Sequence, residues 1–126
     1  MHWFSVGVAL VVAVGIIAIG VMYLFNPRVA TQSFGLPLPE DGANINWWLR
    51  LKGVRDIVSG LVVLALTVWG GPHSIGIALL IEAITPAGDM SLILAAKGSA
   101  KRAIGIHGAT AALMVLAAIP LIAGLA

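Results

Sequence analysis

The feature that most constrains this chain is a group of charged residues inside a segment that otherwise reads as a membrane span. Lys52, Arg55 and Asp56 form this group, with Trp48 before them and Trp69 after them. A helix from Trp48 to Trp69 would rise about 31 Å, which matches the hydrocarbon core of a bilayer. Charged side chains at that depth are costly unless they are paired or wetted, so they predict a functional site.

Composition places the whole chain in the membrane class. Of its 126 residues, 60% are hydrophobic and only 10% are charged, whereas soluble domains carry about 25% charged residues. The hydropathy pattern predicts one transmembrane domain over residues 1–126, with helices at about 3–25, 45–69, 74–96 and 101–121. We therefore expect an all-α fold, a four-helix antiparallel bundle in the membrane.

Charge and cysteine content exclude several functions. The net charge of +2 comes from few residues and does not form the dense basic surface that nucleic-acid binding needs, so we expect no nucleic-acid partner. The absence of cysteine excludes disulfides, thiol catalysis and Cys-ligated metals. A metal held by His107 and the carboxylates is a minor alternative, because one histidine beside two cations suits a metal poorly. We expect neither a metal nor a cofactor.

The basic residues predict the orientation in the membrane. Arg28, Lys97, Lys101 and Arg102 all lie in the two connections that must share one side. The positive-inside rule places those connections in the cytoplasm. Both termini are then extracytoplasmic, in a bacterial inner membrane or an equivalent cellular membrane.

Titratable side chains on three predicted helices fall at similar depths. From the cytoplasmic ends, Asp56 and Asp89 lie about 12 Å deep, His107 about 8 Å and Glu82 about 22 Å. The catalytic candidates are therefore Asp56, Asp89, His107, Glu82 and Arg55. We expect Asp56 and Asp89 to be the acid/base pair, His107 and Glu82 to assist, and Arg55 to position the carboxylates.

Neighbouring residues are candidate substrate contacts. These are Lys52, Ser59, Thr85, Thr110, Met114, Trp48 and Phe34. Phe34 lies in a long connection rich in proline and glycine, which could cover an opening or rest on the membrane surface. For Lys52 taken alone we prefer a structural role, with its side chain reaching toward the interface. Pro86 cannot donate a backbone hydrogen bond, so we expect the third helix to kink there.

Three short motifs carry a family resemblance. Lys-Gly-x-Arg-Asp at 52–56, Thr-Pro-x-Gly-Asp at 85–89 and His-Gly-x-Thr-Ala at 107–111 resemble a family of small four-helix membrane proteins of unassigned function. That family is loosely similar to the DoxX-like superfamily, which implies a fold and a polar core but no reaction. A weaker likeness, in architecture and residue types only, is to small membrane enzymes that open epoxides or cyclise lipophilic metabolites.

The leading functional hypothesis is an intramembrane acid–base enzyme acting on a lipophilic small molecule. It would be a hydrolase or cyclase that opens an epoxide, or an isomerase. Burial and like-charge repulsion can keep one carboxyl protonated beside an ionised one. The alternatives are a proton-coupled carrier of a lipophilic or cationic solute, a non-catalytic membrane subunit of a redox complex, and ion pairs that only fix helix register. The expected partners are the substrate and the lipid bilayer, and a homodimer is left open.

Overall fold

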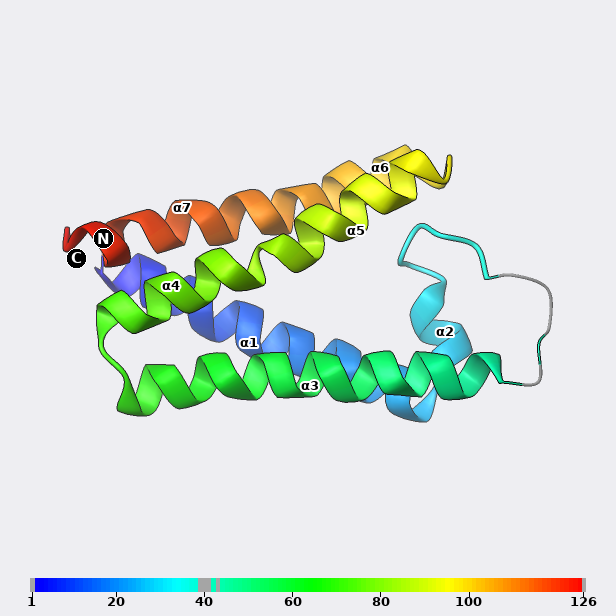
Figure 1. Cartoon of the computed structure of the whole chain (residues 1–126), viewed down its shortest axis with the longest axis horizontal. Coiled ribbons are helices and arrows are strands. Elements are labelled where there is room, and N and C mark those ends of the chain that lie inside the picture. Colours follow the sequence, from blue (N-terminus) through cyan, green and yellow to red (C-terminus); the bar gives the residue numbers. More distant parts are fainter. Residues whose placement is uncertain (1, 39–41, 43, 126) are drawn as a thin grey trace.

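The computed structural model describes residues 2–38, 42 and 44–125, and these residues form helices and no strands (Figure 1). The elements are α1 (His2–Phe25), α2 (Pro27–Thr31), α3 (Ile45–Trp69), α4 (Pro72–Glu82), α5 (Ile84–Ala95), α6 (Ala100–Arg102), η1 (Ala103–Gly108) and α7 (Ala109–Ala123). The last three follow one another without a break, so the chain ends in one long helical rod. The prediction of an all-α protein is confirmed at this level.

Three helical segments are long and apolar enough to cross a membrane, at Trp3–Phe25, Pro72–Ala95 and Ala100–Ala123. They indicate a multi-pass membrane protein. Helix α3 has the length but is not among them. Every stretch of α3 that is long enough to span contains Lys52, Arg55 and Asp56.

Helices α1 and α3 pack side by side along most of their length. One of their close contacts is made by two glycines that face each other. A Cβ atom on Gly20 would lie 2.6 Å from the Gly53 carbonyl oxygen, and a Cβ on Gly53 would lie 2.6 Å from that of Gly20. Because real Cβ atoms do not approach so closely, the contact requires glycine on both helices. Gly7 and Gly15 of α1 instead face open space.

A packed apolar core joins α1, α3, α4 and α7. Its buried members are Val8, Ala9, Ala13, Val63, Ile75, Leu79, Ala83, Met114, Ala117, Ala118 and Leu121. In Figure 1 this core lies toward the end of the molecule where both termini are found. The opposite end contains the loop after α2 and the polar residues described below.

The helical segment formed by α4 and α5 is interrupted between these two helices, at Ala83. The interruption lies three residues before Pro86, whose ring leaves the Glu82 carbonyl without its usual helical donor. The predicted kink is therefore present. Beyond it, α5 packs against η1, and this contact brings together two of the candidate residues.

Candidate functional site

An ion pair within α3 forms one half of the polar cluster. Lys52 Nζ lies 2.7 Å from Asp56 Oδ2, one helical turn away. Asp56 is only 8% exposed, so its charge is balanced inside the protein. The same Nζ lies 4.2 Å from the centroid of the buried Tyr23 ring on α1. This cation–π contact adds to the pairing and directs the ammonium toward α1.

A second pair forms where α5 packs against η1. His107 Nδ1 lies 3.8 Å from Asp89 Oδ2. This separation is too long for a direct hydrogen bond. A water molecule or a polar substrate group placed to one side of the two atoms is within hydrogen-bond reach of both. His107 is buried, whereas the Asp89 side chain keeps 28% of its surface exposed.

The loop after α2 fixes the orientation of the histidine. His107 Nε2 lies 2.8 Å from the Phe34 carbonyl oxygen. A carbonyl oxygen can only accept, so Nε2 carries the hydrogen and donates it. In the neutral imidazole the lone pair is then on Nδ1, on the side of Asp89. His107 is therefore set up to accept a proton at the atom that faces the carboxylate.

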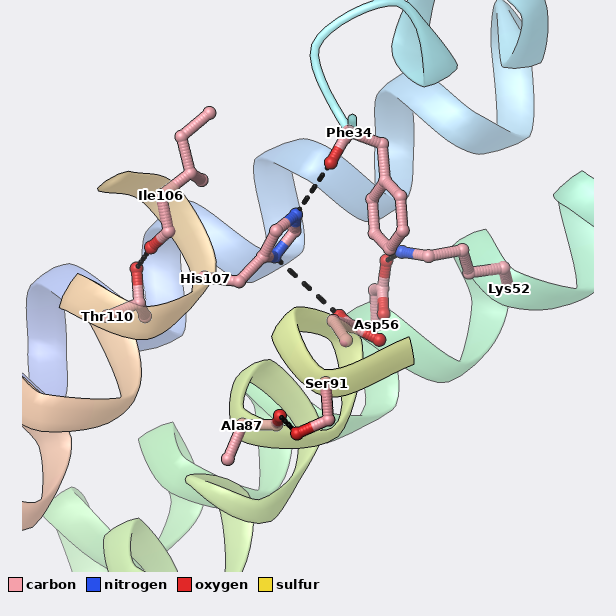
Figure 2. A network of polar contacts seen from close by, with 9 residues as sticks. Phe34, Lys52, Asp56, Ala87, Ser91, Ile106, His107 and Thr110 are labelled. Carbon is pink, nitrogen blue, oxygen red and sulfur yellow. Dashed lines mark hydrogen bonds and ion pairs between the residues drawn. The ribbon is translucent and has the colours of Figure 1, made fainter. Parts of the chain in front are cut away.

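The Phe34 side chain contacts one member of each pair. Its ring centroid lies 5.3 Å from Lys52 Nζ and 4.6 Å from the centroid of the His107 ring, which is tilted by 59°. Figure 2 shows the ring beside the Lys52 ammonium, with His107 on its other side and Asp56 below it. We call Phe34, Lys52, Asp56, Asp89 and His107 the polar cluster. Phe34 closes this cluster from the side of the loop.

Two further contacts hold the loop in place. The Ser99 backbone N–H donates to the Gly35 carbonyl oxygen over 2.9 Å, and Arg102 Nη1 donates to the Gln32 carbonyl. Gly35 has a φ of +103°, a conformation that side-chain-bearing residues rarely adopt. This glycine lets the chain turn directly after Phe34. The loop is thus bound to the same helical rod that carries His107.

His107 lies in a short π-helix, η1, within that rod. Single π-turns inside α-helices are rare and are frequently found at functional sites. Gly108 allows α5 to come close, since a Cβ there would lie 2.7 Å from Met90 Sδ. This π-turn was not predicted from the sequence. Gly105 and Gly108 lie close to the histidine and are weak helix formers, but glycines alone do not predict a π-turn.

Arg55 does not take the expected role. It is exposed on α3, and within the described part of the chain it forms no ion pair or hydrogen bond. Adjacent positions on a helix point in different directions, so Asp56 is paired with Lys52 instead. Lys52, for which a structural role was preferred, is thus the cation of the cluster. Glu82 is half-buried at the end of α4 and makes no hydrogen bond with any clustered residue.

The remaining substrate-binding candidates lie outside the polar cluster. Met114 is buried in the apolar core, and Trp48 is 68% exposed. Thr110 donates its hydroxyl to the Ile106 carbonyl, Thr85 is exposed, and Ser59 is half-buried. Of the seven candidates, only Lys52 and Phe34 join the cluster. No group of three His, Asp or Glu residues in the described part of the chain is arranged to hold a metal ion.

Comparison with known proteins assigns a family. Residues 13–121 match a domain of unknown function (DUF4267). The match spans most of the chain, so the chain belongs to this family. The predicted resemblance to a family of unassigned function is confirmed, and the suggested link to the DoxX-like superfamily finds no support. No curated protein and no solved structure matches the chain.

Proposed function

We propose that this protein carries out acid–base chemistry on a lipophilic small molecule inside the membrane, with His107 and Asp89 as the reacting groups. One observation supports this most strongly. His107 donates from Nε2 to the Phe34 carbonyl and turns Nδ1 toward Asp89 Oδ2 across 3.8 Å. An imidazole held in one tautomer beside a carboxyl group is suited to general acid–base catalysis. This assignment pairs Asp89 with His107 rather than with Asp56.

The proposal includes a membrane arrangement with four spans in an antiparallel bundle. It makes α3 the fourth span, because the Lys52–Asp56 ion pair and the contact with Tyr23 reduce the cost of burying its charges. Exposed Trp48 and Trp69 near the two ends of α3 suit the two interfaces. The connections after α1 and α5 would face the cytoplasm and both termini the opposite side of a bacterial inner membrane or an equivalent one.

In this mechanism the gap between His107 Nδ1 and Asp89 Oδ2 receives the reacting group. For hydrolytic epoxide opening, a water in the gap gives a proton to Nδ1 while its oxygen bonds to an epoxide carbon. As this bond forms, the carbon–oxygen bond of the epoxide breaks, and the released oxygen takes a proton from the Lys52 ammonium. Asp89 stabilises the resulting imidazolium, a role that carboxylates beside histidine perform in other enzymes. After the product leaves, the proton on His107 returns to Lys52 through water, which restores both groups.

Access to the reacting groups depends on Phe34. The ring lies between Lys52 and His107, so a substrate that contacts both must displace it. Loops that move aside and close again commonly exclude water from such sites. The loop is held by hydrogen bonds from Ser99 and Arg102, which can break and re-form without unfolding a helix.

The test is a search for turnover in purified protein. Protein in lipid nanodiscs is incubated with a panel of lipophilic epoxides and isomerisable alkenes in heavy-oxygen water. Hydrolysis adds one heavy oxygen to the product, whereas cyclisation and isomerisation leave the mass unchanged. We expect wild-type protein to convert one class and the Asp89→Asn variant to lose this conversion. Wild-type products identical to those of empty nanodiscs would contradict the enzyme proposal. Proton-driven uptake by proteoliposomes would then favour the carrier.

A further inference from the structure

A basic pocket lies apart from the polar cluster, where the loop after α2 meets the turn between α5 and α6. Its volume is about 620 Å³. Lys97 of the turn and Arg102 of α6 line it with cationic side chains, and Arg28 of α2, which already has a partner in the protein, also borders it. None of the described residues that line it is acidic. A concave site with converging cations favours an anionic ligand.

Lys97 occupies a backbone position that glycine would fill more easily. Its φ is +57°, and it is the only described residue other than glycine with a positive φ. The turn closes α5, with the Gly98 N–H donating to the Ile93 carbonyl oxygen. A lysine in this conformation carries backbone strain, and such strain commonly accompanies a functional side chain. The charge of Lys97 is therefore not explained by the turn itself.

The pocket combines hydrogen-bond donors with an apolar wall. Arg102 uses Nη1 for the Gln32 carbonyl and retains other N–H groups. The Ser99 hydroxyl accepts from the Arg102 backbone N–H, which leaves its own hydrogen to donate. Leu36 and Pro37, which also line the pocket, supply apolar surface. This combination fits a charged group attached to an apolar one.

We propose that this pocket binds a phosphate group, supplied by an anionic phospholipid or by a soluble phosphate compound. The pocket lies at the end of the molecule where α3 begins and α5 ends. Basic pockets at the ends of membrane helices bind anionic lipid headgroups through their phosphates. The proposal does not depend on the acid–base chemistry, because it concerns different residues and a binding measurement.

The experiment is native mass spectrometry of detergent-purified protein titrated with phosphatidylglycerol or phosphatidylcholine. Wild-type protein is expected to bind phosphatidylglycerol more tightly. The Lys97→Gly variant should bind it about fivefold more weakly, the effect of one lost cation. Its melting temperature should stay the same or rise, because glycine relieves the positive φ. Lys101→Gln is the matched control: Lys101 is an exposed cation of α6 outside the pocket, and its loss should leave binding unchanged.

Glycerol phosphate then distinguishes the two sources of the phosphate. If it competes with phosphatidylglycerol, the pocket accepts a soluble phosphate compound. If it does not compete, the pocket requires the lipid. Equal affinity for both lipids together with no binding of glycerol phosphate would overturn the proposal. So would equal weakening by Lys97→Gly and Lys101→Gln, since this would reveal a general surface charge and no defined site.

Discussion

His107 Nε2 donates a hydrogen bond to the carbonyl oxygen of Phe34, 73 residues earlier in the chain, over 2.8 Å. This bond joins the loop after α2 to the helical rod formed by α6, η1 and α7. It also fixes the role of each ring nitrogen: Nε2 donates to the loop, and Nδ1 faces Asp89. The position of the loop and the chemistry of the histidine are therefore linked.

Opening the loop should expose the carboxyl groups of the cluster. In a Phe34→Ala variant, the ring that separates Lys52 from His107 is lost, so apolar reagents can reach Asp56 and Asp89. We expect a hydrophobic carbodiimide to label these two residues faster than in wild-type protein, as measured by mass spectrometry of peptides. Leu36→Ala, an exposed change in the same loop, is the control. Equal labelling of wild type and Phe34→Ala would show that the ring does not control access.

The Lys52–Asp56 pair should show strong coupling in a double-mutant cycle. Lys52→Met leaves the buried Asp56 without its cation. We expect a loss of about 3 kcal/mol in the free energy of unfolding in detergent, the lower end for a buried pair, because the Lys52 side chain is 33% exposed. Removing both charges in Lys52→Met/Asp56→Leu should recover most of this loss, because no unpaired charge remains. Strictly additive effects of the two substitutions would contradict a direct pair.

The α1–α3 contact should be sensitive to a single methyl group. Gly53→Ala would place a Cβ 2.6 Å from the Gly20 carbonyl oxygen. We expect this overpacking to cost about 1–3 kcal/mol of stability, measured by thermal unfolding in detergent. Gly7→Ala is the control, because a Cβ there would meet nothing within 4 Å. If the two variants are equally stable, the helices are not packed as closely as described.

Much of the fold could be predicted from hydropathy, and part of the site from helical rise. The depths along three helices predicted that Asp89 and His107 would be close together. The partner of Asp56 was harder to predict. Lys52 and Arg55 both lie close to Asp56 along the helix, and their spacing does not show which of the two faces the interior. Packing against helix α1 determines the partner, because the Tyr23 ring of α1 lies beside Lys52.

Other parts of the site left no readable signal in the sequence. The acceptor for His107 is a backbone carbonyl, which every residue possesses, so the sequence does not distinguish Phe34 O from its neighbours. The π-turn at η1 depends on packing against α5, which local propensity does not predict. The glycines of α1 look alike in the sequence, yet Gly20 contacts α3 while Gly7 and Gly15 do not.

The topology can be tested with single cysteines in a chain that has none of its own. Gly71→Cys lies between α3 and α4, and Lys101→Cys lies in α6, both at exposed positions. We expect a membrane-impermeant thiol reagent added to intact cells to label Gly71→Cys only. Labelling of Lys101→Cys and not of Gly71→Cys would invert the proposed orientation.

The most direct test of the central claim is the rate of the Asp89→Asn variant relative to its stability. Asparagine keeps the volume of the side chain but removes the negative charge that stabilises the His107 imidazolium. We expect turnover to fall by roughly two to four orders of magnitude with little change in melting temperature. Ile93→Ala, a buried position on the same helix, should lower the melting temperature and largely keep the rate. A melting temperature that falls in Asp89→Asn while the rate stays at the wild-type value would contradict the account, because Asp89 would then serve only to hold the helices together.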